Sequence, residues 1–462
     1  MISKERKGDY LGKTVQVVPH ITDEIQNWVI NVAKIPVDGS EDQPQVCIIE
    51  LGGTIGDIEG MPFVEAFRQF QFKVRRENFC IFHVSLVLQP KSTAEDKTKP
   101  TQASVREIRS LGLSPDFVVC RSELPIQKAT KEKISNFCNV DTAHVICVPD
   151  LASIYDVPLS LIEQNVVELL ADKLNLSGLQ INKQSIENWK SLSNQKSLCN
   201  GEVTIVLVGK YTKLEDAYAS VIKSLNHAAF SCFRNLNLIY IEGCDLEEKT
   251  KRSDLDKYKE AWTKLQSANG VLIPGGFGRR GTDGKMEAIR WSRENQVPLL
   301  GICLGLQLIA IEFAKNVLKL DDANSTEMDE TCKHQIVIDM PEHNQGKLGG
   351  TMRLGKRTTI FNTENSKLRQ LYSGAQKIEE RHRHRYEVNP SYVKQFNEAG
   401  LKFVAQDETG MRMEILELDN HPYFVAVQYH PEYKSKPSKP SPPFLGLIQA
   451  AIDRTGIISG DV

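Results

Sequence analysis

The chain has 462 residues, a formal net charge of −2 at pH 7 and 40% hydrophobic residues. The near-zero charge argues against a general nucleic-acid or anionic-membrane binder, and no apolar run approaches the length of a membrane span. The ten cysteines are scattered, with no Cys-x-x-Cys pair, which is typical of a reduced compartment. We therefore expect a cytoplasmic protein of two or three domains, with neither a membrane nor a nucleic acid as its partner.

The first part of the chain alternates short apolar runs with amphipathic segments. We expect a first domain over residues 1–175, built on a parallel sheet with helices. Its predicted strands are Val46–Ile49, Phe82–Leu88, Phe117–Cys120 and Val145–Val148. Residues 176–200 are rich in Asn, Gln, Ser and Lys with little apolar periodicity, and we interpret them as an interdomain linker.

The same alternation returns over residues 201–455, and residues 456–462 follow as a tail. The predicted strands of this second domain are Val203–Val208, Leu238–Ile241, Gly270–Ile273, Val297–Ile302, Ile336–Ile338 and Phe424–Gln428. An apolar helix, Phe444–Ile452, closes it. The predicted fold class is α/β, with two domains that each contain a mainly parallel sheet covered by helices on both faces.

One stretch of the second domain carries the strongest chemical signal. The predicted strand Val297–Ile302 breaks at a turn that contains Gly301, Cys303 and Gly305, and Leu306–Phe313 then shows helical spacing of apolar residues. This is the cysteine form of a nucleophile elbow. Small residues permit the sharp turn, and the helix N-terminus favours the thiolate. The pattern predicts Cys303 as a nucleophile.

A nucleophilic thiol needs a base, an orienting group and donors for an oxyanion. His430 can act as the base, and Glu432, on the same face of an extended segment, can orient its imidazole. The glycine-rich turn at the end of Val271–Gly278 can present backbone N–H groups. Taken singly, a buried cysteine is usually core, a His-Pro-Glu is usually a turn, and paired glycines usually punctuate the chain. Their occurrence in this order, each after an apolar run, favours the catalytic interpretation.

The first domain carries signals for a nucleotide. Val46–Glu50 is expected to be a strand that ends in a carboxylate, where α/β proteins place a Mg²⁺ ligand near phosphates. A glycine-rich turn with Asp57 and Glu59 follows, and Lys97–Gln102 gathers two lysines and two hydroxyl residues in a short loop. Alone, that loop is more often a solvated turn. Together with the predicted Mg²⁺ ligand and the glycine-rich turn, we interpret it as a triphosphate site.

These motifs give the chain a family resemblance. Residues 200–455 resemble the class I, triad-type glutamine amidotransferase domain. The whole chain resembles the eukaryotic members of the CTP synthase family. The segments that carry this second resemblance are Lys7–His20, Glu50–Glu59, Phe67–Phe70, Lys97–Gln102, Gly209–Thr212, Asn324–Glu327, Pro341–Asn344, Gly349–Gly355 and Arg381–Glu387.

The resemblance implies a P-loop-like synthetase domain followed by a class I glutaminase domain. It implies a ligase that phosphorylates O4 of UTP with ATP and then displaces the phosphate with ammonia from glutamine. It also implies Mg²⁺, GTP as an allosteric activator, CTP as a feedback inhibitor, and assembly into homotetramers and filaments. One alternative is a different amidotransferase that uses the same class I glutaminase domain, and the synthetase motifs disfavour it.

The resemblance also implies roles for particular residues. The catalytic triad is Cys303, His430 and Glu432. Glutamine and its oxyanion are expected to contact Gly276, Leu304, Gly305, Leu306, Gln307, Glu327 and Arg385. UTP and inhibitory CTP are expected to contact Asp57, Ile58, Glu59, Lys97, Thr98, Lys99, Pro100, Thr101, Gln102 and Lys133. Glu50 matches a Mg²⁺ ligand, Pro149, Asp150 and Leu151 match an ATP contact, and Phe277 with Arg280–Lys285 matches a lid near which GTP acts.

The sequence departs from the family pattern at its start. Family members place a strand, a glycine-rich phosphate loop and a second acidic Mg²⁺ ligand before the segment that matches Lys7–His20. This sequence has no counterpart to that part, so we expect an N-terminally truncated synthetase domain. A truncated gene model, an alternative start or a short isoform would each explain it. The alternative function is then a glutaminase-competent, synthetase-deficient chain that acts as a regulatory subunit.

Overall fold

The structure is a computed structural model that describes residues 1–37, 41–91, 95–176, 178, 182–195, 198–212, 215–340 and 352–454. The chain divides into two compact units, Met1–Ser193 and Asn194–Val462. Helix α8 (Lys183–Gln195) lies within the segment expected as a linker. Among the described residues, no helix combines the length and the apolar character that crossing a membrane requires. The predicted tail, residues 456–462, lies outside the described residues.

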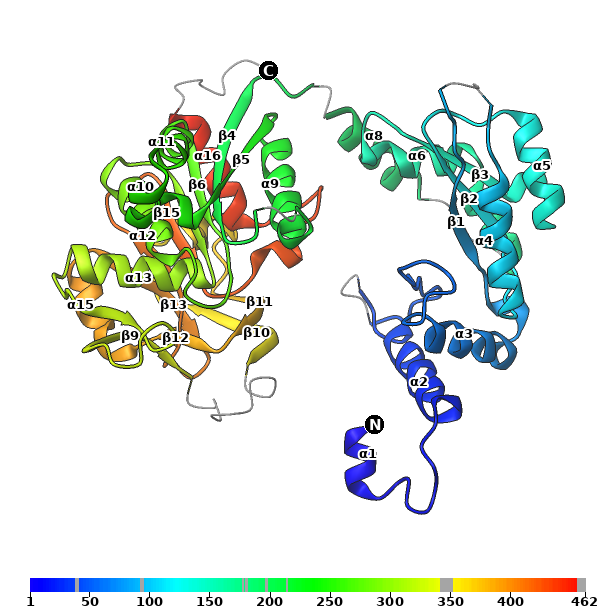
Figure 1. The fold of residues 1–462 in the computed structure, drawn as a ribbon, viewed down its shortest axis with the longest axis horizontal. Helices are drawn as coiled ribbons and strands as arrows, with labels where there is room; N and C mark the ends of the chain where they lie inside the picture. Colours follow the sequence, from blue (N-terminus) through cyan, green and yellow to red (C-terminus); the bar gives the residue numbers. More distant parts are fainter. Residues whose placement is uncertain are drawn as a thin grey trace. The chain divides into compact units, whose positions relative to one another are not determined.

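The first unit contains a three-stranded parallel sheet in the order β1-β2-β3. Its strands are β1 (Phe82–Leu86), β2 (Phe117–Ser122) and β3 (Val145–Pro149). Its helices besides α8 are α1 (Ile2–Lys7), α2 (Thr22–Ala33), α3 (Met61–Val74), α4 (Lys99–Ser110), α5 (Lys128–Cys138), α6 (Val157–Glu163) and α7 (Val166–Lys173). Apolar residues of α4 and α5 pack on one face of the sheet and those of α6 and α7 on the other (Figure 1). Three predicted strands and the two-faced layering are thus present.

The predicted strand Val46–Ile49 is wrong. Residues 45–50 have no regular structure, and the side chains of Val46, Ile48 and Ile49 are 40%, 93% and 41% exposed. A strand is stabilised by hydrogen bonds to a neighbouring strand, and among the described residues of this unit β1 pairs with β2 alone. Apolar composition predicts burial, but it does not supply that neighbour.

The second unit is built on a nine-stranded sheet in the order β11-β10-β13-β14-β15-β7-β6-β4-β5. Its strands are β4 (Glu202–Gly209), β5 (Asn235–Glu242), β6 (Gly270–Ile273), β7 (Leu299–Ile302), β10 (Arg353–Phe361), β11 (Lys377–His384), β13 (Leu401–Asp407), β14 (Met413–Leu418) and β15 (Phe424–Val427). The half from β5 to β15 is parallel, as the sequence predicts. The half from β14 to β11 is antiparallel and was not predicted.

Helices cover both faces of this sheet because its strands are apolar on both sides. Alternate residues of β4 enter two separate cores, with Val206 and Val208 in one and Ile205 and Leu207 in the other. The helices of this unit are α9 (Ala219–Ser231), α10 (Glu248–Ser253), α11 (Leu255–Gln266), α12 (Thr282–Glu294), α13 (Leu304–Asn316), α14 (Lys367–Leu371), α15 (Val393–Glu398) and α16 (Pro442–Arg454). Apolar residues of α11, α12 and α13 form the first core and those of α9 and α16 the second (Figure 1).

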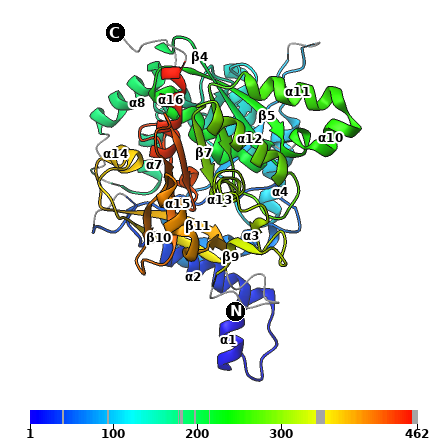
Figure 2. The ribbon, with the colours of Figure 1, turned by 90° about the vertical axis from the view of Figure 1, so that its left-hand side faces the viewer.

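Two smaller features complete this unit. A three-stranded sheet has the order β12-β9-β8, with β8 (Ala323–Ser325), β9 (His334–Asp339) and β12 (Tyr386–Val388). Helix α14 packs against α16 (Figure 2). The family segment Pro341–Asn344 and the first residues of Gly349–Gly355 lie outside the described residues.

Candidate active site

Cys303 occupies a sharp turn between β7 and α13. Its φ is +54° and its ψ is −102°, an unusual backbone conformation for a residue with a side chain. A Cβ atom on Gly305 would lie 2.3 Å from the carbonyl oxygen of Ile273, and one on Gly301 would lie 2.8 Å from Ile309. Both flanking positions therefore require glycine. The backbone N–H of Cys303 donates to the carbonyl of Val427 at 2.7 Å, which fixes the turn to strand β15.

The parallel pairing of β7 with β15 brings His430 to this turn. His430 follows the end of β15, and its backbone N–H donates to the carbonyl of Arg381 at 2.7 Å. Its Nδ1 lies 2.8 Å from Oε1 of Glu432. Burial alone lowers the pKa of His430, but the negative charges of the Cys303 thiolate and the Glu432 carboxylate outweigh it and raise that pKa above its ordinary value. The three predicted triad residues therefore lie together, with a hydrogen bond between His430 and Glu432 and with Cys303 close enough to affect the pKa of His430.

A glycine loop, Pro274–Gly278, lies beside this set. A Cβ atom on Gly275 would be 3.0 Å from Cε1 of His430 and 3.5 Å from Cβ of Cys303. One on Gly276 would be 3.6 Å from Leu304, the first residue of α13. The first N–H groups of a helix have no acceptor within it. Gly276 therefore lies beside the first turn of α13, where the N–H groups are available to an acceptor outside the helix.

Two of the residues predicted to hold glutamine contact this loop. Oε1 of Glu327 accepts from the N–H of Gly278 at 2.8 Å. The guanidinium of Arg385 lies 5.6 Å from the ring centre of Phe277. Both Glu327 and Arg385 are half-buried. A carboxylate and a guanidinium at one end of a thiol site complement the ammonium and carboxylate groups of a free amino acid.

Gln307, in the first turns of α13, has a different environment. It is buried, and its Nε2 donates to the carbonyl of Tyr386 at 2.9 Å and lies 3.3 Å from Oε1 of Gln428. Gly305 and Leu306, in the same turn, are also buried. Gln307 therefore ties the elbow helix to the segment that follows β11.

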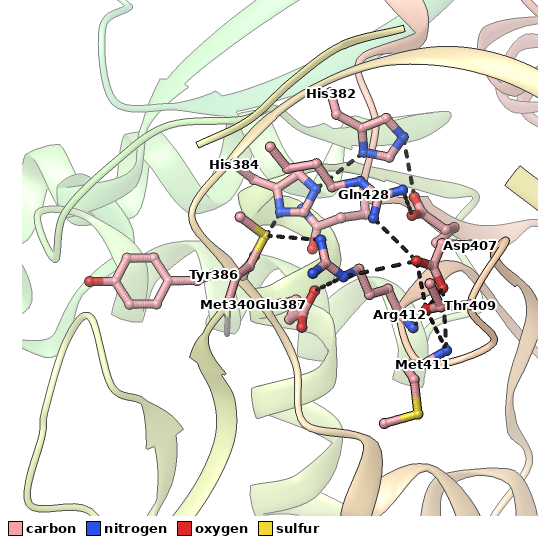
Figure 3. A network of polar contacts seen from close by, with 12 residues as sticks. Met340, His382, His384, Tyr386, Glu387, Asp407, Thr409, Met411, Arg412 and Gln428 are labelled. Carbon is pink, nitrogen blue, oxygen red and sulfur yellow. Dashed lines mark hydrogen bonds and ion pairs between the residues drawn. The ribbon is translucent and has the colours of Figure 1, made fainter. Parts of the chain in front are cut away.

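A buried polar network lies beside Gln428, and Figure 3 shows how its side chains converge. His382 and His384 are in contact through Nδ1 and Nε2 at 3.2 Å, and His384 also contacts the carbonyl of Tyr386 at 3.0 Å. Burial lowers the pKa of both histidines, so both are neutral. The network is linked through β11 to the carbonyl groups of Arg381 and Arg383 at the site.

The predicted triphosphate loop lies at the N-terminus of α4 in the first unit. Thr98 is the N-cap, and Lys99 and Pro100 form the first turn. Thr98 and Thr101 are buried, and Lys99 is exposed. Helix N-termini present unpaired N–H groups and a partial positive charge, both suited to phosphate. Lys97 forms an exposed ion pair with Glu95 at 2.5 Å, and Gln102 donates to Thr98 at 3.0 Å.

The other predicted nucleotide residues lie on the surface of the first unit. Asp57, Ile58 and Glu59 are exposed in a turn, and Lys133 is exposed on α5. Pro149 ends β3 and Asp150 and Leu151 follow it, where Asp150 forms an ion pair with Arg121 at 2.8 Å. Glu50 is exposed and has no regular structure. Within the described part of the chain, no hydrogen bond or ion pair joins Glu50, Asp57, Glu59, Lys133 or Asp150 to another of this set.

Glu50 is the predicted Mg²⁺ ligand, and its surroundings decide which kind of Mg²⁺ site is possible. Among the described residues, no group of three or more Asp, Glu, His or Cys side chains is placed to hold a metal. Mg²⁺ commonly takes one or two protein carboxylates and completes its shell with phosphate and water. A single exposed carboxylate therefore fits a metal that arrives with a nucleotide, and does not fit a metal held by protein groups alone.

Two lysines behind the glycine loop are buried, which was not predicted from the sequence: Lys285 was expected only at the end of the lid Arg280–Lys285 and Lys210 only within the family segment Gly209–Thr212. Lys285 is 0% exposed and Lys210 is 2% exposed. Lys285 belongs to the buried stripe of α12 with Ala288, Ile289 and Ser292. That spacing of three, four and seven residues was a usable signal, because a lysine on the apolar face of a helix has to be explained.

Comparison with known proteins agrees with this division of the chain. Residues 1–176 match the family model for the CTP synthase N-terminus, and residues 213–450 match that for the class-I glutamine amidotransferases. CTP synthase of Drosophila pseudoobscura pseudoobscura is 61% identical over 98% of this chain and 71% of its own length. CTP synthase 1 of Homo sapiens is 59% identical over 98% of this chain and 77% of its own length. The solved glutaminase domain of Trypanosoma brucei CTPS with bound acivicin is 36% identical, with a TM-score of 0.50 over 54% of this chain and 94% of that domain.

Proposed function

The chain belongs to the CTP synthase family, and we propose that its Cys303, His430 and Glu432 are the triad that releases ammonia from glutamine. Its activity is the ATP-dependent amination of UTP to CTP with glutamine as the nitrogen donor. The observation that supports the triad best is the strained turn at Cys303 with His430 and Glu432 hydrogen-bonded beside it.

The geometry supports a thioester mechanism. The Cys303 thiolate attacks the side-chain amide carbon of glutamine, and the N–H groups of Gly276 and Leu304 stabilise the oxyanion that forms. Protonated His430 gives its proton to the departing nitrogen, so ammonia leaves and a γ-glutamyl thioester remains. Neutral His430 then takes a proton from water, which attacks the thioester and releases glutamate. Glu432 holds the imidazole in the orientation that both steps require.

An assay with two nitrogen donors separates this activity from the alternative. CTP formation from UTP and ATP should be measured first with glutamine and then with ammonium salt. CTP with both donors is the expected result. Hydrolysis of glutamine without CTP from either donor would instead support the synthetase-deficient alternative, which the similarity over nearly the whole chain does not favour.

We propose that Arg385 and Glu327 hold the α-carboxylate and the α-ammonium of glutamine, with Gln307 and the Leu304–Leu306 turn alongside. Arg385→Lys keeps the charge but loses the planar fork that pairs with a carboxylate. We expect the KM for glutamine to rise about 10-fold or more, equivalent to roughly 1.4 kcal/mol or more of binding, with a smaller change in kcat. Ammonia-dependent CTP formation is the control and should not change. An unchanged KM would contradict this role.

We propose that the N-terminus of α4 binds the phosphates of UTP, and of CTP as inhibitor, with Lys97–Gln102, Asp57–Glu59 and Lys133 as the contact residues. Lys99→Met removes a cation at this helix end. We expect the KM for UTP to rise about 10-fold with either nitrogen donor, because a charge-assisted phosphate contact is lost. Lys128→Met, at the start of α5, is the control and should leave that KM unchanged. A rise with glutamine but not with ammonia would contradict the assignment.

Other parts of the proposal rest on the family alone. Glu50 would bind Mg²⁺ that accompanies ATP, which supplies charge neutralisation for phosphoryl transfer. Pro149–Leu151 would contact ATP, and GTP would act near Phe277, whose ring is 41% exposed. We also propose assembly into homotetramers and filaments, in the cytoplasm.

A further inference from the structure

Lys285 is a fully buried lysine next to the thiol site. Its Nζ donates to the carbonyl oxygen of Pro274 at 3.3 Å. Among the described residues, no carboxylate lies within ion-pair distance of this ammonium. Lysine is rarely buried without a charged partner, because removing an ammonium from water is costly. A position that keeps such a group needs a reason beyond packing.

The carbonyl that Lys285 contacts begins the glycine loop. In a trans peptide, the C=O and the N–H point in opposite directions. With the Pro274 carbonyl held by Lys285, the N–H of Gly275 faces away from the lysine. The ideal Cβ position of Gly275 lies 3.0 Å from His430 Cε1. The Pro274–Gly275 peptide is therefore held with its carbonyl group toward Lys285, and its Gly275 lies beside His430 of the triad.

At the other end of the loop, a buried lysine also holds a carbonyl group, and the N–H of the same peptide points the opposite way. Nζ of Lys210 donates to the carbonyl of Phe277 at 3.0 Å and also to that of Gly278. The N–H of Gly278, on the opposite side of the Phe277–Gly278 peptide, donates to Glu327 at 2.8 Å. The N–H of Gly276 thus lies between two peptides whose carbonyl groups are each held by a buried lysine.

Lys285 stands on a rigid base. A Cβ atom on Gly284 would lie 1.8 Å from the carbonyl oxygen of Gly243, and one on Gly243 would lie 2.4 Å from that of Gly281. The first turn of α12 therefore packs backbone to backbone against the short helix η7 (Gly243–Leu246). Such close packing leaves the first turn of α12 little freedom to move. The backbone position of Lys285, from which its side chain contacts Pro274, is therefore fixed as well.

The charges around Lys285 do not favour it as a stabilising residue. Burial, and next the neighbouring Lys210, lower the pKa of Lys285 to about 7, with Arg280 acting in the same direction. Glu242 and Cys303 oppose this shift. Two buried cations that repel one another cost stability, so an apolar side chain would be the better choice for folding alone.

We propose that Lys285 is a positioning residue for glutamine hydrolysis, which holds the Pro274 carbonyl from behind so that the N–H of Gly276 stays directed at the oxyanion formed on Cys303. The proposal rests on the triad proposed above. It predicts that removing the ammonium separates catalysis from stability, because the lysine serves the transition state and not the fold.

The test compares Lys285→Met with Ile289→Val, a conservative change one turn further along the same buried face of α12. For Lys285→Met we expect the kcat for glutamine hydrolysis to fall about 10- to 100-fold with the glutamine KM changed less than about twofold, as for a misplaced oxyanion donor. Ammonia-dependent CTP formation should not change, and the melting temperature should be no lower than that of the unaltered chain. Ile289→Val should keep its kcat.

A second measurement tests whether the oxyanion is the step affected. Alkylation of Cys303 by iodoacetamide, followed on its own peptide by mass spectrometry, forms the C–S bond as iodide leaves and makes no oxyanion. Its rate should be the same in Lys285→Met and in the unaltered chain. An unchanged kcat would overturn the proposal, as would an equal loss of alkylation, or a loss of kcat together with a lower melting temperature.

A second variant guards against a failure to fold. Lys285→Gln keeps a polar side chain at the buried position and should show the same loss of kcat. Failure of both variants to fold would show a structural role and overturn the proposal. Cys303→Ala, assayed in parallel, keeps the two proposals distinct. If Cys303→Ala is inactive while Lys285→Met is fully active, only the positioning role fails, whereas glutamine hydrolysis by Cys303→Ala would remove the triad itself.

Discussion

Cys303→Ala is expected to abolish glutamine-dependent CTP formation, by roughly 10⁴-fold or more, while ammonia-dependent formation continues at its normal rate. Alanine removes the only atom that can form the thioester, and it leaves the turn between β7 and α13 otherwise intact. Free ammonia bypasses that step. The measurement is the rate of CTP formation with each donor, together with the release of glutamate from glutamine.

Two further variants place His430 and Glu432 in the same reaction. His430→Ala should resemble Cys303→Ala, because both the thiolate and the departing nitrogen depend on its proton. Glu432→Gln should lose less, since the amide can still contact Nδ1 of His430 at the 2.8 Å position. Glutamate release by Cys303→Ala at a near-normal rate would contradict the triad. So would a Glu432→Gln variant as inactive as His430→Ala.

The parallel half of the glutaminase sheet was predictable because its strands are buried on both faces. β4, β6, β7 and β15 appear in the sequence as continuous apolar runs, and the elbow at Cys303 is marked by local glycines. The pairing of β15 with β7 was not available from local pattern. The approach of His430 to Cys303 rested instead on the order of the motifs and on the family resemblance.

Strand β11, at the edge of the antiparallel half, escaped prediction because most of its buried side chains are polar. β11 buries Glu380, His382 and His384 in alternation with exposed charged residues. When the buried and the exposed positions of a strand both carry polar or charged residues, the sequence shows no alternation of hydrophobicity, although the burial itself alternates with the period of a strand. In the first unit the error was the reverse, since the apolar run Val46–Ile49 predicted a strand that has no neighbouring strand among the described residues.

Arg353 is the charged group on which the polar side of this sheet depends. Its guanidinium lies 3.4 Å from Asp407 and 3.0 Å from Glu414, and its side chain is only 9% exposed. Burial raises the pKa of Glu414 to about 8, and Arg353 is the first influence to oppose that rise. The pKa of Asp407 is below its ordinary value, because hydrogen bonds from Thr409 and Arg412 and the charge of Arg353 outweigh its burial.

Arg353→Met is therefore expected to destabilise the antiparallel half of the sheet by about 3 kcal/mol at pH 8, since it leaves a buried carboxylate short of its partner. Lys356→Met, on the same strand, breaks an ion pair whose side chains are 69% and 53% exposed, and should cost less than about 0.5 kcal/mol. Hydrogen exchange of the amides of β13 and β14 measures both changes on the sheet itself.

A carboxyl whose folded pKa is lowered contributes stability above its unfolded pKa, and that stability is lost as the pH falls through the folded value. The difference between Arg353→Met and the unaltered chain should accordingly shrink in two steps, first as Glu414 takes up a proton below about pH 8 and then as the pH falls through the lowered pKa of Asp407. Equal, small effects of the two substitutions would show that the buried bridge adds no net stability, and that the network around His382 and His384 is held by backbone pairing alone.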